Sequence, residues 1–406
     1  MNTKYDILII GGGAAGFFTA INIAEKNKNL KIGILERGKE VLSKVRISGG
    51  GRCNVTHACF IPNELVKFYP RGERELKGPF NQFCSGDTIE WFTNHGVNLK
   101  IEEDGRMFPE TDSSQTIVDC FLNSCQKLKI DILTLQSVQS LFKKEIGWKV
   151  DTNSDSFLCK KVILTTGSNP KIWELLTQLG HSIIPPVPSL FTFNIKDARI
   201  KDLMGLSALA TVKVKETNLK ATGPLLITHW GMSGPGILRL SAWGARLLFE
   251  KNYKFSLQVN WLNETSFEEC VEQLKEIKIQ NNKKQINTFC PFDFPKRLWE
   301  KLIQAANINP ELKWADCSKK QLISLAEQLT NGTFQVDGKS TFKEEFVTAG
   351  GIDLKEINFK SMESKILPDL YLAGEILNID AITGGFNFQN AWTGGFLISE
   401  ALKKTV

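Results

Sequence analysis

Three glycines near the start of the chain have the spacing of a nucleotide-binding loop. Gly11, Gly13 and Gly16 form the pattern G-x-G-x-x-G between a short apolar run and a stretch of helical character. The first glycine permits a tight turn, the second lets the backbone approach a pyrophosphate, and the third allows close packing of helix on strand. Ala14 and Ala15 open the predicted helix, whose first N–H groups and positive dipole end favour phosphate. The spacing therefore predicts a dinucleotide at this turn.

An acidic residue follows at the distance that such a loop requires. Glu36 lies 20 residues after Gly16, at the end of a second apolar run, where a carboxylate can accept hydrogen bonds from ribose hydroxyls. A carboxylate there would repel a 2′-phosphate and disfavours an NADP-type ligand, although the adjacent Arg37 weakens that argument. Strand, glycine loop, helix and acid together predict a βαβ unit that binds NAD or FAD.

A glycine-rich unit at the far end of the chain helps to distinguish between NAD and FAD as the ligand. Glu375 follows an apolar run and Gly374, and is placed to reach a ribityl or phosphate-side hydroxyl. Gly385, Phe386 and Asn387 begin the last predicted helix, whose N–H groups would face the flavin N1/O2 edge, where negative charge collects on reduction. A chain that returns at its far end to the same ligand suits FAD, whose flavin lies away from its adenine. An NAD-only Rossmann dehydrogenase is the alternative.

The most unusual segment is the glycine-containing stretch 43–56. Gly49–Gly51 are three consecutive glycines, which offer bare backbone amides to an anion or to a ring. Lys44 and Arg52 supply positive charge, and Asn54 supplies a neutral hydrogen-bonding group. We interpret the segment as a loop, 38–56, that lies along the pyrophosphate and the flavin, and a flexible loop without ligand is the plainer reading.

Two further side chains could take part in redox or proton chemistry. Cys53 could be a redox thiol, but flavin disulfide reductases need a second, closely spaced cysteine, and Cys59 is six positions away. We therefore favour packing for Cys53. His229 lies in a glycine-rich turn and could act as an acid above the flavin, and a hydrogen-bonded structural histidine fits the sequence equally well. Four scattered histidines and no Cys/His cluster predict no metal site.

The predicted cofactor contacts also include two residues that follow the buried run 161–164. The full set is Gly11, Gly13, Ala14, Ala15, Gly16, Glu36, Arg37, Lys44, Ser48, Gly49, Gly50, Gly51, Arg52, Cys53, Asn54, Thr166, Gly167, Gly374, Glu375, Gly385, Phe386 and Asn387.

These residues must be positioned by an α/β domain that an insertion interrupts. A proline-rich stretch, 185–188, marks a change of pattern, and the style of the first domain resumes near residue 349. We predict a Rossmann-like domain (1–190 and 348–406), a β-barrel-like insert (191–263 and 331–347) and a helical subdomain (264–330).

Several elements are predicted within these domains. Helices are expected near 87–94, 115–127 and 387–403, and strands at 130–134, 138–142, 147–152, 156–159, 161–164, 333–336, 342–347 and 370–373. In the insert, short strands with one glycine-rich interruption at 222–236 are expected between 190 and 260.

Composition and charge narrow the class of protein. Of 406 residues, 42% are hydrophobic and 23% charged, which excludes a disordered or fibrous chain. No apolar run is long enough to span a bilayer, and the run 7–10 lacks the flanks of a signal peptide. Nine scattered cysteines favour reduced thiols, so we expect a cytoplasmic protein. The net charge of +6 is spread along the chain, whereas nucleic-acid binding favours a concentrated basic stripe.

Four segments together carry a family resemblance. They are the glycine fingerprint with Glu36, the run Ser-Gly-Gly-Gly-Arg-Cys-Asn at 48–54, the segment 228–235, and the C-terminal unit 373–387. The chain resembles the BaiN-like family of bacterial FAD-dependent oxidoreductases. The resemblance implies a Rossmann-like FAD domain with an inserted β-barrel and a helical subdomain, and implies that 11–16, 48–54 and 384–390 surround FAD. One position departs from the pattern: His57 stands where a second asparagine is expected.

The sequence thus predicts an FAD-dependent oxidoreductase. We expect a hydride to pass between a small organic substrate and flavin N5, while the protein positions the ring and tunes its potential. NAD(P)H or O₂ is the expected redox partner. Besides the NAD-only dehydrogenase, the alternative from another class is an FAD-containing protein that binds or modifies RNA, whose RNA affinity would fall steeply with salt.

Overall fold

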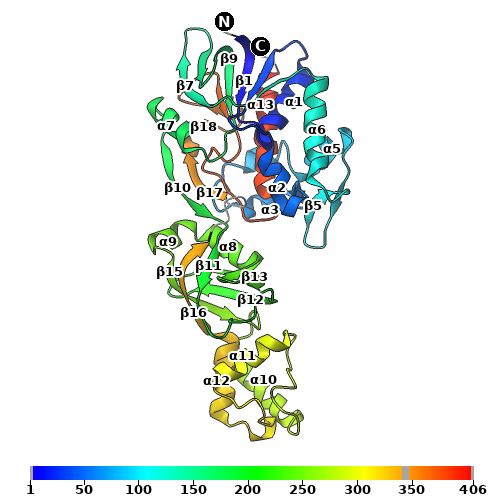
Figure 1. The fold of residues 1–406 in the computed structure, drawn as a ribbon, viewed down its shortest axis with the longest axis vertical. Helices are drawn as coiled ribbons and strands as arrows, with labels where there is room; N and C mark the ends of the chain where they lie inside the picture. The colour runs from blue at the N-terminus through cyan, green and yellow to red at the C-terminus, as the bar shows by residue number, and fades with distance from the viewer. Residues whose placement is uncertain (1–2, 341–346, 404–406) are drawn as a thin grey trace. The chain divides into compact units, whose positions relative to one another are not determined.

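The structure, a computed structural model, describes residues 3–340 and 347–403. It divides into two compact units, Met1–Val187 with Val347–Val406, and Pro188–Phe346 (Figure 1). The first unit is therefore discontinuous in sequence, and the second is inserted into it. The mixed α/β class with a Rossmann-like domain and an inserted barrel is confirmed.

A sheet with a parallel centre forms the middle of the first unit. Its strand order is β18-β19-β20-β9-β1-β2-β6, with parallel pairing from β20 to β6. Ile7, Leu8 and Ile9 are fully buried, as expected for a strand covered on both faces. The strands are β1 (Thr3–Ile10), β2 (Ile32–Leu35), β6 (Asp131–Leu133), β9 (Ser156–Leu164), β18 (Ile357–Asn358), β19 (Glu363–Ser364) and β20 (Leu370–Leu372).

Two helices from opposite ends of the chain pack against each other in this unit (Figure 1). They are α1 (Ala14–Lys26) and α13 (Phe386–Leu402). A Cβ added at Gly395 would lie 2.6 Å from Thr19 Oγ1, and one at Gly394 would lie 3.0 Å from Ala373 Cβ. The two glycines therefore let α13 approach both α1 and the end of β20. This approach brings the predicted N- and C-terminal cofactor segments into one unit.

Among the remaining elements of the first unit, two helices and two strands agree with the segments predicted at 87–94, 115–127, 138–142 and 147–152, and the others were not predicted. The helices are α3 (Pro62–Leu65), α4 (Lys77–Phe80), α5 (Ser85–Asn94), α6 (Ser114–Lys127) and α7 (Pro170–Gln178). The strands are β3 (Thr56–His57), β4 (Leu99–Ile101), β5 (Arg106–Pro109), β7 (Val138–Lys143), β8 (Trp148–Thr152), β10 (Ile183–Ser189) and β17 (Val347–Ile352).

Two predictions for this unit were wrong. The strands expected at 156–159 and 161–164 are the single strand β9, which pairs with β8 along its first half and with β1 along its length. The predicted loop 38–56 contains a helix, α2 (Ser43–Gly51). The two units divide after Val187, within the proline-rich stretch 185–188, and this stretch forms the strand β10, which pairs with β17, since prolines are tolerated on an edge strand. The expected strand 342–347 lies outside the described residues except for Val347, which begins β17.

A closed barrel of antiparallel strands forms the larger part of the second unit. Its strand order is β11-β14-β13-β12-β15-β16. The bounds are β11 (Thr192–Ile195), β12 (Ser207–Val214), β13 (Lys220–Ile227), β14 (Gly231–Ser233), β15 (Lys254–Asn260) and β16 (Gly332–Ser340), and two helices follow β14, α8 (Pro235–Trp243) and α9 (Ala245–Glu250).

The predicted interruption at 222–236 was wrong in its first half. β13 runs through Gly223 and Pro224, with Ala221, Leu225 and Ile227 buried. A Cβ added at Gly223 would lie 3.1 Å from the backbone nitrogen of Gly236 in α8. The glycine here serves close packing of a helix on a strand and does not end the strand.

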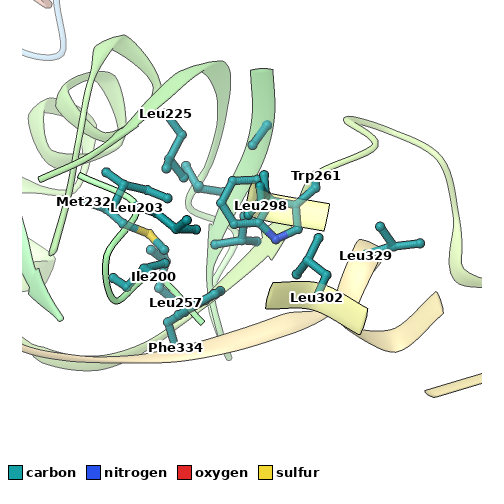
Figure 2. Close-up of a cluster of buried hydrophobic side chains, with 14 of the residues drawn as sticks. Ile200, Leu203, Leu225, Met232, Leu257, Trp261, Leu298, Leu302, Leu329 and Phe334 are labelled. Carbon is teal, nitrogen blue, oxygen red and sulfur yellow. The ribbon is translucent and has the colours of Figure 1, made fainter. Parts of the chain in front are cut away.

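Three helices share the core of the barrel. They are α10 (Phe267–Gln280), α11 (Lys296–Ala305) and α12 (Lys319–Thr330). Ser266 with Glu269 and Ser318 with Gln321 form capping boxes at α10 and α12. Figure 2 shows Trp261 among buried side chains from the barrel strands, the loop after β11, α11 and α12, so barrel and helices have one continuous core.

Candidate functional site

The glycine loop after β1 has the geometry of a turn that only glycine permits. Gly11 has φ +116°, and a Cβ there would lie 2.5 Å from the carbonyl oxygen of Thr165. A Cβ on Gly16 would overlap the carbonyl oxygen of Gly11. A Cβ on Gly13, by contrast, would meet no protein atom within 4 Å. The loop is thus closed against the protein at Gly11 and Gly16 and open at Gly13.

The open position coincides with the start of α1. Gly13 is the N-cap residue, with no side-chain cap, and the first turn, which begins with Ala14 and Ala15, contains no acidic residue. The free N–H groups and the positive end of the helix dipole are therefore not neutralised by an acidic side chain of the first turn. This arrangement can bind the phosphates of a dinucleotide.

Glu36 lies against the glycine loop at the end of β2. Its Oε2 accepts a hydrogen bond from the Gly12 N–H at 3.0 Å, and its Oε1 accepts one from the Gly38 N–H at 2.7 Å. A carboxylate oxygen can accept more than one hydrogen bond, so both retain capacity for ribose hydroxyls. Arg37 is exposed at the surface. The ribose contact stays a prediction, and the structure adds that Glu36 also stabilises the loop.

The triple glycine in α2 turns its backbone into the left-handed region. Ser48 leaves the helical region with ψ 150°, and Gly49, Gly50 and Gly51 have φ +58°, +68° and +86°. A Cβ on Gly50 or Gly51 would meet no protein atom within 4 Å, whereas one on Gly49 would lie 2.9 Å from the Asn54 nitrogen. Successive backbone N–H groups in such conformations form a concave site for an anion or a polar ring edge.

The basic side chains near this turn have acidic partners within the protein. Lys44 Nζ lies 2.7 Å from Glu375 Oε2. Arg52 Nη1 lies 2.5 Å from Glu102 Oε1, and the Arg52 guanidinium lies 3.9 Å from the ring centroid of Phe108. Both cations are thus already paired within the protein. Their contacts with a cofactor stay predictions.

The thiol of Cys53 is shielded from solvent. The side chain is fully buried, and burial raises its pKa to about 12. A thiol in that state is protonated at neutral pH and is a poor nucleophile. This environment favours packing over redox chemistry for Cys53. All nine cysteines lie among the described residues, and each is free.

The C-terminal turn meets the segment 54–56. Gly385 has φ +90°, and a Cβ there would lie 2.5 Å from the Thr56 carbonyl oxygen. With its amide oxygen facing the turn, Asn54 accepts a hydrogen bond from the Gly385 N–H at 3.0 Å. The Asn387 side chain closes the turn by accepting from the Ala381 N–H at 3.0 Å and donating to its carbonyl. The N–H of Gly385 therefore already has an acceptor in the protein.

Two further glycines bring the remaining predicted segments together. Gly374 has φ +80°, and a Cβ there would lie 3.4 Å from the Ala15 Cβ. Gly167 has φ +61°, with Glu375 Oε2 3.5 Å from its added Cβ. The hydroxyl of Thr166 lies 3.5 Å from the Gly167 carbonyl oxygen. Predicted residues from both ends and from the strand β9 thus surround the same edge of the sheet.

Sequence reasoning missed an aromatic stack beside the C-terminal turn. The Phe386 ring lies 4.6 Å from the His57 ring and 4.4 Å from the Phe68 ring, centroid to centroid. The Tyr69 hydroxyl donates to the Phe386 carbonyl at 2.5 Å. No local pattern joins these residues, because the fold brings them together from positions far apart in the chain.

A buried ion pair that local patterns did not predict holds the same turn. Arg71 makes a bidentate contact with Asp380, although 309 positions separate them. Asp380 is fully buried. Paired charges in such a location orient the backbone around them strongly, because separating the pair leaves a buried charge.

His229 lies in the second unit. It is exposed in the turn between β13 and β14, and lines a cavity within that unit. Its predicted role as an acid stays a prediction. Within the ranges 3–340 and 347–403, no group of three or more His, Cys, Asp or Glu side chains is placed to hold a metal ion. In the same ranges, the helices are all too short or too polar to cross a membrane.

Comparison with known proteins gives matches over nearly the whole chain. The family described as HI0933-like protein Rossmann domain matches residues 5–401. The ribosomal RNA dihydrouridine synthase of Escherichia coli K12 is 27% identical over 409 residues, covering 98% of each chain. The 3-dehydro-bile acid delta(4,6)-reductase of Clostridium scindens is 26% identical over 425 residues, covering 97% of this chain and 98% of the relative.

One solved structure is similar in fold at low sequence identity. It is the 3-ketosteroid-delta4-(5alpha)-dehydrogenase from Rhodococcus jostii RHA1 in complex with 4-androstene-3,17-dione. The two chains are 14% identical, with a TM-score of 0.53, and the match covers 99% of this chain and 97% of the dehydrogenase.

Proposed function

The chain belongs to the HI0933-like Rossmann family, and we propose that it is an FAD-dependent oxidoreductase that reduces a carbon–carbon double bond conjugated to a carbonyl group. The reactions that the names of two relatives describe both act on a double bond of this type. Forming dihydrouridine saturates the ring double bond of uracil, which is conjugated to a carbonyl. A delta(4,6)-reductase of a 3-dehydro bile acid saturates double bonds conjugated to a 3-oxo group. The family match also confirms the family resemblance that the sequence motifs indicated.

The main observation that supports a bound cofactor is the open space at Gly13, where α1 begins. No protein atom lies within 4 Å of a Cβ added at Gly13, Gly50 or Gly51, so backbone N–H groups from two segments are accessible to a ligand. Glu36 lies beside the first segment and presents its carboxylate for a ribose. These residues fit FAD. Bound and reduced, FAD would supply a hydride to the carbon β to the carbonyl, and a proton would be added at the α carbon.

FAD is better supported than NAD as the resident dinucleotide. The C-terminal turn is joined to the N-terminal segments by the ion pair between Lys44 and Glu375 and by the contact of Gly374 with Ala15. A site built from both ends of the chain is longer than one βαβ unit, as a dinucleotide that extends into a flavin requires. An NAD-only dehydrogenase would not need the C-terminal turn.

The cofactor proposal is tested by adding one methyl group at matched glycines. Gly13 has φ −99° and ψ −169°, which alanine adopts readily, so Gly13→Ala should fold normally. It should lose FAD, because the added Cβ fills the space in which a pyrophosphate would approach. The readout is the flavin absorbance of the purified protein and equilibrium titration of the apoprotein with FAD.

The control is Gly78→Ala. Gly78 lies in α4, and a Cβ there also meets no protein atom within 4 Å. This variant should keep the FAD affinity of the wild type. Unchanged FAD affinity in Gly13→Ala would contradict the proposed placement of the pyrophosphate, and a purified wild-type protein that shows no flavin bands and does not bind FAD would contradict the cofactor itself.

Two classes of substrate contain a double bond of this kind, and the molecule that contains it is here called the carrier. A small organic enone is the first, and a uracil base within RNA is the second, which the name of the Escherichia coli relative favours. NADH and NADPH are the expected electron donors, and O₂ is the expected competing acceptor. The flavin absorbance reports both reduction by a donor and reoxidation by O₂. A cytoplasmic location is part of the proposal, in agreement with the free cysteines.

Substrate assays separate the two carriers. The reduced enzyme is mixed either with a panel of cyclic enones and dienones or with unmodified ribosomal RNA transcripts. Reoxidation of the flavin and a mass gain of two hydrogens in the product identify the carrier. A reduced enzyme that transfers hydride to neither class, while O₂ still oxidises it, would contradict the proposed reaction.

A further inference from the structure

A cavity within the second unit has a lining that the oxidoreductase chemistry does not explain. It has a volume of about 810 Å³ and lies between the loop after β11 and the turn between β13 and β14. Its lining includes Lys196, Lys201 and Arg297, which come from that loop and from α11. The fold thus brings Arg297 of α11 close to two lysines of the loop after β11 that are about a hundred positions earlier in the chain.

These cations have no acidic side-chain partners in the described part of the chain. Lys196 and Lys201 are exposed and take part in no ion pair there. Arg297 Nη1 donates only to the carbonyl oxygen of Asp202, at 3.4 Å. Long cationic side chains that are not paired internally remain available to an anion from solution.

The acidic residues of the lining do not balance these charges. Of the two carboxylates in the lining, Asp197 is neutralised by Arg199, whose Nη2 lies 2.7 Å from Asp197 Oδ2. Only Asp202 then remains to oppose the three cations. The cavity therefore has a net positive charge and attracts an anion.

The lining also offers surfaces on which a flat ring can pack. Ile195 and Ile200 line the cavity but are themselves buried in the barrel core (Figure 2) and leave the ring contacts to the exposed side chains. Met204 is 49% exposed, and His229, which lines the same cavity, is also exposed. Imidazole rings and thioethers make favourable contacts with aromatic bases. The three cations and these two exposed side chains line the same cavity, and together they fit a nucleotide unit.

We infer that this cavity binds a single-stranded segment of RNA, with Lys196, Lys201 and Arg297 on its phosphates and a base against Met204 and His229. The inference rests on the proposed reductase function for the identity of the carrier, which it makes a uracil in RNA. Proteins that bind single-stranded RNA combine a positively charged groove with side chains on which bases stack. All residues of the site belong to the second unit.

The test measures binding of a fluorescein-labelled, uridine-rich RNA of twelve nucleotides to the full-length, FAD-loaded protein by fluorescence anisotropy. The variant Lys196→Ala/Lys201→Ala/Arg297→Ala should bind the RNA at least about tenfold more weakly. The slope of log affinity against log salt should fall by about two, since each lost phosphate contact on a single strand contributes about 0.7.

The matched control removes three exposed lysines that lie outside the lining. Lys215→Ala/Lys319→Ala/Lys320→Ala changes the net charge by the same amount and should bind RNA within about twofold of the wild type. Equal weakening in both variants would overturn the site, since the loss would then follow from overall charge. Met204→Glu is a second probe, because a carboxylate in the lining should repel RNA with one substitution.

Competition separates RNA from a small anion. Uridine monophosphate, inorganic phosphate and unlabelled RNA are compared as competitors at equal concentrations of nucleotide or phosphate. If either small anion displaces the labelled RNA as well as unlabelled RNA does, the RNA assignment is overturned. Failure of the wild type to bind RNA would also overturn it, while leaving reduction of small enones intact. RNA that binds through the cavity and contains no dihydrouridine after turnover would instead contradict the proposed reaction on RNA and leave the binding site standing.

Discussion

Lys44 Nζ lies 2.7 Å from Glu375 Oε2, an ion pair between residues that are 331 positions apart in the chain. The other carboxylate oxygen of Glu375 accepts a hydrogen bond from the Thr348 N–H at 3.1 Å. One side chain therefore joins α2, the start of β17 and the end of β20. Glu375 was predicted to hold a hydroxyl of the cofactor, and it also holds three segments of the candidate site together.

The two partners of this ion pair should differ in their effects on stability. Lys44→Ala should cost less than about 1 kcal/mol, because the lysine side chain is 61% exposed and water replaces the lost contact. Glu375→Ala should cost about 1–3 kcal/mol, because the Thr348 N–H loses its acceptor. Thermal unfolding of both apoproteins measures the difference. Equal losses would mean that the ion pair, and not the backbone contact, carries the stabilisation.

Glu36→Ala should weaken FAD binding by about 1–3 kcal/mol, the cost of an unmet hydrogen-bonding group. It should also destabilise the apoprotein, because the N–H groups of Gly12 and Gly38 lose their acceptor. FAD titration and thermal unfolding of the apoprotein measure these two effects separately.

Glu40→Ala is the control for Glu36, since Glu40 is exposed on the same loop. It should leave both quantities unchanged. A Glu36→Ala protein with lower stability but wild-type FAD affinity would restrict Glu36 to a structural role in the glycine loop.

Cys53 should resist alkylation in the folded protein. Its thiol is fully buried and its pKa is raised to about 12, so the reactive thiolate is scarce at pH 8. Iodoacetamide followed by peptide mass spectrometry should label Cys53 only after unfolding, whereas the partly exposed Cys59, Cys84 and Cys290 serve as internal references. A Cys53→Ala protein that binds FAD but loses electron transfer would restore the redox interpretation.

His57 should make the stability of the protein depend on pH in the acidic range. Burial lowers the pKa of His57, although its contact with the Asp104 carbonyl acts in the opposite direction. The unfolded state therefore binds a proton at a higher pH than the folded state does. The stabilisation is complete above the unfolded value of about 6.5 and declines as the pH falls below it.

Melting temperatures of the wild type and His57→Asn between pH 5.5 and 7.5 measure this effect. The wild type should lose stability more steeply on acidification than the variant. His95, whose pKa is raised by Glu25 despite burial, contributes with the opposite sign in both proteins and cancels in the difference. Parallel curves would show that His57 does not titrate differently in the two states.

Local geometry explains why much of the first unit could be predicted from the sequence. The pattern Gly11, Gly13 and Gly16 constrains one turn, and the structure shows a close contact at the first and last of these positions. β13 shows the limit of such reasoning. Gly223 and Pro224 predicted an interruption, but Gly223 packs against Gly236 of α8, a contact that no local pattern contains.

The sequence by itself determined the βαβ unit with its glycine loop and Glu36, because these depend on residues that are neighbours in the chain. The tertiary structure alone decided that Asn54 faces the Gly385 N–H, that Lys44 pairs with Glu375, and that three cations gather in one cavity. The spread of charge along the chain disfavoured nucleic-acid binding, yet the barrel brings the loop after β11 beside α11. Periodicity tells which face of a strand or helix is buried, but it does not tell which distant segment covers that face.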